Sequence, residues 1–196
     1  MNPSLPSLLA AAESGDTQAM NDLAWYYGGD DDTPRDQAKY IYWTKRSAEL
    51  GDADGMYNLG VMHVRGDLGP ININAANQLW MQAAEKGNPP AMANLALSYL
   101  KGNGFPANPQ TALSWMKKSA LCDMPKGMFS VGQFYQFGMG TPIDMVEALA
   151  WFLLAAQRFP QAAESMDFVS AKLTPLQKAQ AHRRAEVIRM EIVPEK

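Results

Sequence analysis

A glycine-containing loop, LKGNGFP, is the first segment whose residue types could support chemistry. It runs from Leu100 to Pro106 and precedes the helix-like segment ALSWMKKSA. Backbone N–H groups in such a loop can cradle a phosphate. A phosphate-binding loop follows a strand and carries a lysine after its glycines, and the sequence shows neither arrangement here. We therefore interpret LKGNGFP as a tight turn between two helices.

The histidines and the single cysteine do not form a catalytic or metal-binding set. His63 and His182 each lack a second histidine or cysteine at metal-ligand spacing. We predict that His63 packs like an aromatic residue, with a role as ligand or base as the alternative, and that His182 lies on a solvated helix. Cys122 permits no internal disulfide, and we expect an inert thiol. No enzymatic activity, cofactor or metal site is predicted.

Two charged clusters offer further candidates. The acidic run Asp30–Asp32 could bind a cation, but no EF-hand spacing follows it, so a solvated turn is favoured. The basic residues of the last helix could contact an acidic partner, although a solvated helix face is again favoured. These residues are His182, Arg183, Arg184 and Arg189. Nucleic acid is not an expected partner, because basic and aromatic residues do not alternate.

The composition is that of a folded protein with an uneven charge. The chain has 196 residues, 47% of them hydrophobic and 19% charged, with a net charge of −3. Residues 1–98 hold 6 basic and 12 acidic side chains, whereas residues 99–196 hold 11 and 8. No apolar run approaches the ~18 residues of a membrane span, and the N-terminus lacks the basic region of a signal peptide. We expect a cytoplasmic protein, or a periplasmic one if a signal peptide has been removed.

Self-similarity at a period of 36 residues organises most of the chain. The repeated segments are LAWYY at 23–27, LGVMH at 59–63, LALSY at 95–99 and VGQFY at 131–135. The same step relates a methionine position, a mostly tryptophan position and a small-residue position. These positions hold Met20, Met56, Met92 and Met128; Trp43, Leu79, Trp115 and Trp151; and Ala48, Ala84, Ala120 and Ala156. Trp80 stands one place out of register, on a neighbouring face.

Each repeat is predicted to form two helices, A and B, joined by a loop with Gly, Pro or Asp. The apolar positions of both helices fall at helical spacing, and Gly51 and Gly87 suit the position after a helix. Stacked hairpins bury a continuous core that one hairpin cannot bury alone. We predict one solenoid over 1–196: a half-repeat at 1–16, repeats at 17–52, 53–88, 89–124 and 125–160, and capping helices at 161–196.

The repeat unit resembles the Sel-one-like repeat (SLR) family, a relative of the tetratricopeptide repeats. The third and fourth repeats match its pattern best, at Tyr99, Gly102, Gly104, Asn108, Ala112 and Trp115 and at Tyr135, Gly138, Gly140, Asp144, Ala148 and Trp151. Departures occur at Tyr40, His63, Asp123 and Phe159. The resemblance implies an all-α, right-handed α/α superhelical solenoid that acts as a scaffold or adaptor for other proteins. Some paired-cysteine members resemble penicillin-binding hydrolases, but this chain has one cysteine.

The resemblance also implies that helix A lines a concave, partner-binding surface. Its free positions, between the repeated framework residues, are predicted to bind a protein or peptide, or simply to cover the helix. They hold Trp25, Asp22, Asn58, Val61, Arg65, Asn94, Leu97, Lys101, Ser130 and Gln133, with Gly29 and Phe137 in the same pattern. An immunity or inhibitor protein that covers a toxin or effector is the alternative function. We expect a monomer, or a weak dimer through the end repeats.

Overall fold

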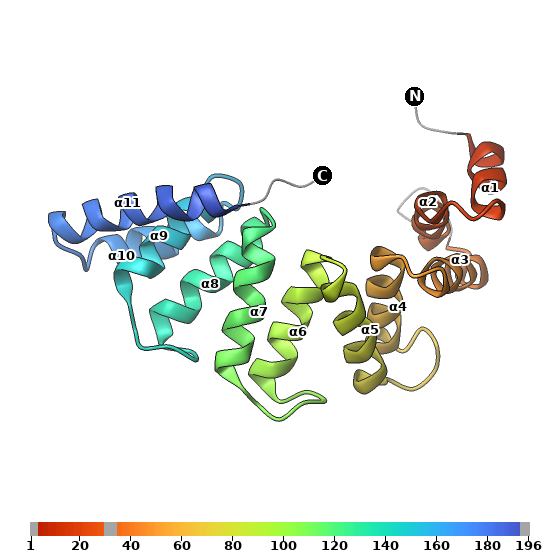
Figure 1. Cartoon of the computed structure of the whole chain (residues 1–196), viewed down its shortest axis with the longest axis horizontal. Helices are drawn as coiled ribbons and strands as arrows, with labels where there is room; N and C mark the ends of the chain where they lie inside the picture. The colour runs from red at the N-terminus through yellow and green to blue at the C-terminus, as the bar shows by residue number, and fades with distance from the viewer. Residues whose placement is uncertain (1–3, 30–34, 193–196) are drawn as a thin grey trace. The chain divides into compact units, whose positions relative to one another are not determined.

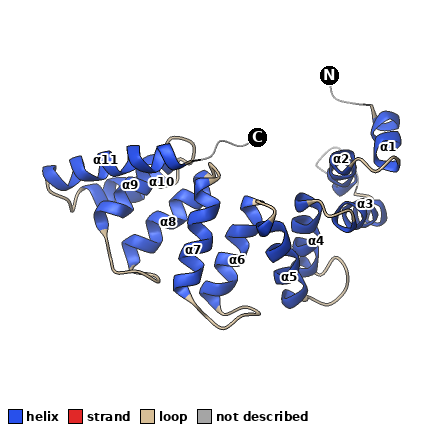
Figure 2. Ribbon diagram, viewed as in Figure 1, coloured by secondary structure: helices blue, strands red, loops and turns tan. Residues whose placement is uncertain are grey.

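The computed structural model describes residues 4–29 and 35–192, and all regular structure within these ranges is α-helical (Figures 1 and 2). The helices are α1 (Leu5–Glu13), α2 (Thr17–Gly28), α3 (Gln37–Glu49), α4 (Ala53–Arg65), α5 (Ile73–Glu85), α6 (Pro89–Lys101), α7 (Pro109–Leu121), α8 (Pro125–Phe137), α9 (Met145–Ala155), α10 (Ala162–Ser170) and α11 (Pro175–Glu191). Helices α2, α4, α6 and α8 are the predicted A helices, and α3, α5, α7 and α9 are the B helices.

Side-chain caps fix where the helices begin. The residue before each B helix is Asp36, Asn72, Asn108 or Asp144, and each accepts a backbone N–H from the first turn. Such oxygens satisfy one of the donors that a helix N-terminus leaves unpaired. Three A helices begin after a similar cap, at Asp16, Asp52 and Asn88. The fourth, α8, begins at a proline after Met124, which makes no side-chain cap.

The LKGNGFP loop is the turn between α6 and α7, as predicted. Gly102 follows α6 in the left-handed region, with φ of 74°, where glycine avoids the steric cost that other residues incur. At the far end of the loop, Asn108 N–H donates to the Tyr99 carbonyl oxygen at 2.8 Å. The equivalent bond closes the loop of the fourth repeat, from Asp144 to Tyr135 at 3.0 Å. The loop backbone is therefore used to connect two helices.

The chain divides into two compact units, Met1–Ala91 and Met92–Lys196, and each is described by itself. In the first unit, Met20, Leu23 and Trp43 form an apolar cluster against which α1 packs. In the second unit, α10 and α11 both pack on α9. The four methionines of the repeated position are at most 9% exposed, which confirms them as core residues.

Trp80 occupies a packing position that the fourth repeat shares. It is 6% exposed and lies on Gly60 of α4, where an added Cβ would come within 2.5 Å of the indole Nε1. Phe152, 72 residues later, lies in the same way on Gly132 of α8, again at 2.5 Å. Absence of a side chain on the A helix lets an aromatic ring from the B helix approach its backbone.

The junction between the first and second repeats is polar. Ser47 donates to Asn21 Oδ1 at 2.8 Å, and Asn21 in turn donates to Asp52 Oδ1 at 2.8 Å. Thr17 donates to Asp52 Oδ2 at 3.1 Å, and Asp52 also accepts the Gly55 N–H. Burial by itself raises the pKa of the Asp52 carboxyl, but the hydrogen bonds that it accepts outweigh burial and lower this pKa below its ordinary value.

Candidate protein-binding surface

In the first unit, the predicted binding residues lie on α2 and α4, which contact each other. Trp25 is exposed over 76% of its surface, and Asp22 lies half-buried one turn before it. On α4, Asn58 and Val61 are half-buried and Arg65 is exposed. The helical spacing of three and four residues puts these side chains on one face of each helix.

In the second unit, the corresponding residues lie on α6 and α8. Leu97 is 43% exposed, Lys101 is exposed and Asn94 is half-buried on α6. On α8, Ser130 and Gln133 are half-buried. The Ser130 hydroxyl donates to the Lys126 carbonyl oxygen of the preceding turn at 3.0 Å, so its proton is already engaged within the helix.

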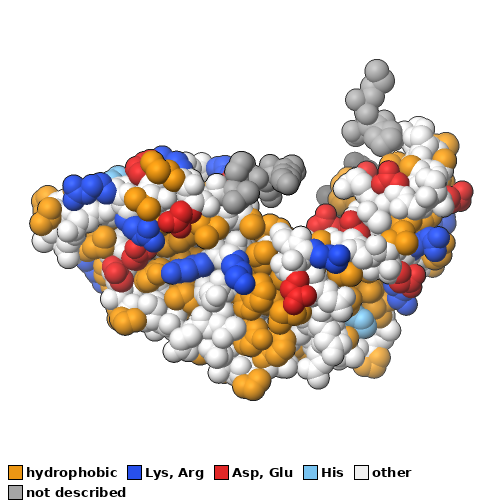
Figure 3. Space-filling model, viewed as in Figure 1, with side chains coloured by type: hydrophobic (Ala, Val, Ile, Leu, Met, Phe, Trp, Pro, Cys, Tyr) orange, Lys and Arg blue, Asp and Glu red, His pale blue; other side chains and the backbone are white. Residues whose placement is uncertain are grey.

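The surface carries side chains of several kinds. On the face shown in Figure 3, hydrophobic, basic and acidic side chains are interspersed. Tyr26, beside Trp25, is 40% exposed and adds an aromatic residue to the predicted set, and Phe137, at the end of α8, is 61% exposed. The sequence pattern contained Phe137 but gave no reason to rank it above its neighbours. Its exposure results from its position at the last residue of the helix.

Two of the four residues in the basic cluster of α11, Arg184 and Arg189, form ion pairs within the chain. Arg184 Nε lies 2.5 Å from Glu147 Oε1 of α9, and Arg189 Nη1 lies 2.9 Å from Glu186 Oε1 one turn before it. The expectation of a solvated face is therefore wrong for Arg184, which is half-buried and joins α11 to α9. Arg183 and His182 are exposed.

The remaining chemical candidates do not come together. His63 is half-buried on α4, in the tyrosine position of the repeat, and Cys122 is half-buried directly after α7. The acidic run Asp30–Asp32 lies outside the described residues. Within residues 4–29 and 35–192, no group of three or more His, Cys, Asp or Glu side chains could hold a metal ion. No helix in these ranges is both long enough and apolar enough to cross a membrane.

Comparison with known proteins identifies the repeat. The Sel1 repeat family matches residues 17–52, 53–88, 89–124 and 125–158. The chain therefore belongs to the Sel1 repeat family, and the predicted fold class, an all-α solenoid of helix-turn-helix repeats, is confirmed. Helical repeats of this family typically mediate protein–protein interaction. No curated protein matches the sequence.

Solved structures of bacterial proteins share the fold. The protective antigen c5321 of uropathogenic Escherichia coli, which displays an SLR fold, is 30% identical with a TM-score of 0.85; the match covers 94% of this chain and 40% of c5321. A Sel1 repeat protein of Oxalobacter formigenes is 25% identical with a TM-score of 0.73, over 83% of this chain and 48% of that protein. The chain thus spans less than half of either protein.

A third structure, the immunity protein Pa5087 of Pseudomonas aeruginosa, is 21% identical with a TM-score of 0.58. The match covers 94% of this chain and 70% of Pa5087. At this identity the likeness shows the fold alone.

Proposed function

We propose that this protein is a non-catalytic scaffold or adaptor that binds a partner protein or peptide through the exposed face of its A helices. The observation that carries the proposal is the contrast between two faces of these helices. Leu23 and Leu95 of the framework are fully buried, whereas Trp25 and Leu97, two residues further on, are 76% and 43% exposed. The same repeat position thus presents a large apolar side chain to solvent in repeats one and three, which supports an interaction surface there.

The residue types suit recognition of a polypeptide. Tryptophan and arginine are enriched among the residues that dominate binding energies, and Trp25 and Arg65 stand on adjacent helices of the first unit. The amides of Asn58 and Asn94 each both donate and accept hydrogen bonds, which matches the alternating donors and acceptors of a peptide backbone. Each unit therefore offers an apolar contact beside a polar one.

A non-catalytic role is the simplest interpretation of the site chemistry. The predicted binding residues include no pair of nucleophile and base, and the titratable side chains among them are Asp22, Arg65 and Lys101. The hydrolases of the paired-cysteine type depend on a cysteine pair that a chain with Cys122 alone does not contain. The proposal therefore includes no catalytic residue, no cofactor and no metal.

An affinity capture experiment tests the proposed surface. The wild-type protein is compared with a triple variant, Trp25→Ala, Asn58→Ala and Asn94→Ala, in lysate of the source organism, followed by mass spectrometry. Phe168→Ala is the matched control, because Phe168 is an aromatic residue of α10 that is 53% exposed outside the A helices. Circular dichroism verifies that all variants fold.

A partner that the wild type and Phe168→Ala retain, and that the triple variant loses, supports the proposal. Equal retention by all three proteins would refute the A-helix surface. The identity of the partner decides the alternative function: stoichiometric, very tight binding of one toxin or effector would indicate an immunity or inhibitor protein. The fold likeness to Pa5087 motivates this alternative, and weaker binding of several partners favours an adaptor.

Compartment and assembly complete the proposal. A single cysteine suits a reducing compartment, so we propose a cytoplasmic location, which fractionation of the source cells tests. We also propose a monomer, or a weak dimer through the end repeats. Light scattering at increasing protein concentration distinguishes the two, and a stable dimer at the lowest concentration would contradict both.

A further inference from the structure

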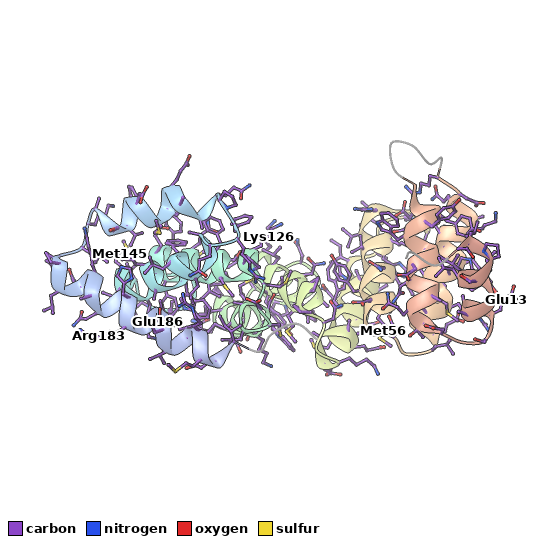
Figure 4. All side chains as sticks on the ribbon, turned by 90° about the horizontal axis from the view of Figure 1, so that it is seen from above. Glu13, Met56, Lys126, Met145, Arg183 and Glu186 are labelled. Atoms are coloured by element: carbon purple, nitrogen blue, oxygen red, sulfur yellow. The ribbon has the colours of Figure 1, made fainter. Side chains whose placement is uncertain are left out.

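A groove in the first unit lies away from the A-helix surface. It has a volume of about 330 Å³ and lies between α3 and α5, over α4. Its apolar lining comes from Ala48, Met56, Leu59 and Leu79. Figure 4 labels Met56 on α4. Asn58 is two residues from Met56, a rotation of about 200° around the helix, so the groove and the proposed A-helix surface are on different sides of α4.

The groove coincides with a missing tryptophan. Leu79 occupies the position that is Trp43, Trp115 and Trp151 in the other repeats. In the first repeat, Trp43 is 6% exposed and belongs to the same apolar cluster as Leu9 and Ala12. In the fourth repeat, Trp151 is 3% exposed and clusters with Ala120 and Leu121. Leu9 and Ala12 stand 36 residues before Lys45 and Ala48, and Ala120 and Leu121 stand 72 residues after Ala48 and Glu49. The tryptophan neighbours of the other repeats therefore occupy the positions that line the groove here.

The framework leucine of the A helix is also less buried in the second repeat than in the others. Leu23, Leu95 and Val131 are fully buried in repeats one, three and four. Leu59, their counterpart in the second repeat, is half-buried and lines the groove. A smaller side chain at position 79 therefore leaves apolar surface uncovered that an indole covers elsewhere in the same molecule.

We propose that this groove binds a tryptophan side chain of a partner peptide, flanked by one acidic and one basic residue. The indole takes the place that the chain's own tryptophan takes in the other repeats. The groove wall carries Lys45 and Glu49, one turn apart on α3, and neither takes part in an ion pair of the described residues. An acidic flanking residue complements Lys45, and a basic one complements Glu49.

The remaining polar group of the groove suits the indole itself. Gln82 of α5 is an exposed residue that lines the groove, and the oxygen of its amide can accept a hydrogen bond from an indole N–H, which only donates. Tryptophan is thus favoured over phenylalanine, which would leave that acceptor without a donor from the ligand.

The test is a titration of the full-length protein, followed by methyl NMR. The probe is an acetylated and amidated peptide with one tryptophan between a glutamate and a lysine, and the control peptide carries alanine in place of tryptophan. The proposal predicts shifts of the Met56 and Leu59 methyl groups with the tryptophan peptide. Leu79→Trp, which restores the tryptophan of the other repeats, should weaken binding at least about tenfold.

Equal binding of both peptides, equal binding by wild type and Leu79→Trp, or no shift at Met56 and Leu59 would each overturn the proposal. Leu79→Phe is the second filling variant if Leu79→Trp does not fold. The triple variant of the A-helix surface should bind the peptide as the wild type does. The experiment therefore tests peptide binding in the groove separately from partner binding on the A-helix surface.

Discussion

The junction between repeats one and two and the junction between repeats three and four pack equivalent helices with different chemistry. In the first, Asn21, Ser47 and Asp52 form a hydrogen-bonded chain between α2, α3 and the start of α4. In the second, the corresponding residues are Ala93, Ser119 and Met124, and the Ser119 hydroxyl lies 3.4 Å from the Met124 sulfur. The repeat thus specifies helix positions, not one set of contacts.

Repeats two and four, one in each unit, by contrast share an internal contact. Trp80 on Gly60 and Phe152 on Gly132 use the same aromatic-on-glycine contact. In these two repeats the helix pair is fitted by shape, with a ring of the B helix against a glycine of the A helix. The junction can change chemistry because any set of groups that leaves no buried polar atom unpaired is acceptable there.

We expect the largest loss of stability when the aromatic ring of the shared contact is removed. Trp80→Ala and Phe152→Ala should each lower the free energy of unfolding by about 3–5 kcal/mol, because each leaves a cavity beside its glycine. Urea denaturation, with hydrogen exchange of α4 and α8 to assign each loss to its unit, measures both. A loss confined to one of the two variants would break the parallel between the units.

Adding a methyl group to the glycine at each junction should have a smaller effect on stability, and the effect should differ between the two junctions. In Gly55→Ala the new Cβ would lie 2.7 Å from the Ala48 backbone nitrogen, so the helices must shift, at a cost of about 1–3 kcal/mol. In Gly127→Ala the nearest atom, the Ala120 nitrogen, is 3.1 Å away. The gain in helix propensity from Gly to Ala, about 1 kcal/mol, should largely offset the cost of that milder contact.

Thermal denaturation of the two glycine variants checks this order. Gly55→Ala should melt below the wild type, and Gly127→Ala close to it. The reverse order would mean that the polar junction is the more adaptable of the two.

Asp52→Ala should break the polar junction. It removes the cap of α4 and leaves Asn21 and Thr17 without their acceptor, for a loss of about 1–3 kcal/mol in the free energy of unfolding. Asp52→Asn is the control, because asparagine at the equivalent Asn88 caps the next A helix. Guanidinium denaturation should rank the wild type above Asp52→Asn and Asp52→Ala last.

The smallest expected effect is a pH dependence of the first unit. The pKa of Asp52 is lowered in the folded protein, so its carboxylate stabilises the fold at pH values above the ordinary aspartate pKa. That contribution is lost as the pH falls below about 3.8 and through the lower folded-state pKa. The stability difference between the wild type and Asp52→Asn should therefore shrink on acidification. A difference that stays constant from neutral pH to the acid limit would contradict this role.

The sequence by itself determined the elements and their repetition. Helical spacing is local, so the buried methionines follow from the 36-residue pattern alone. Capping side chains act within three residues, and the B helices begin after four residues that the same period relates: Asp36, Asn72, Asn108 and Asp144. The candidate A-helix residues are positions that the same pattern leaves between the framework residues.

Only the tertiary structure decided which neighbours meet. Leu59 is half-buried although its equivalents are fully buried, because its exposure depends on the side chain that another helix supplies at position 79. Arg184 pairs with Glu147, 37 residues away, and the Trp80 ring packs against Gly60 on the preceding helix. Burial and ion pairing are properties of contacts between elements, whereas a helix and its cap are properties of one continuous segment.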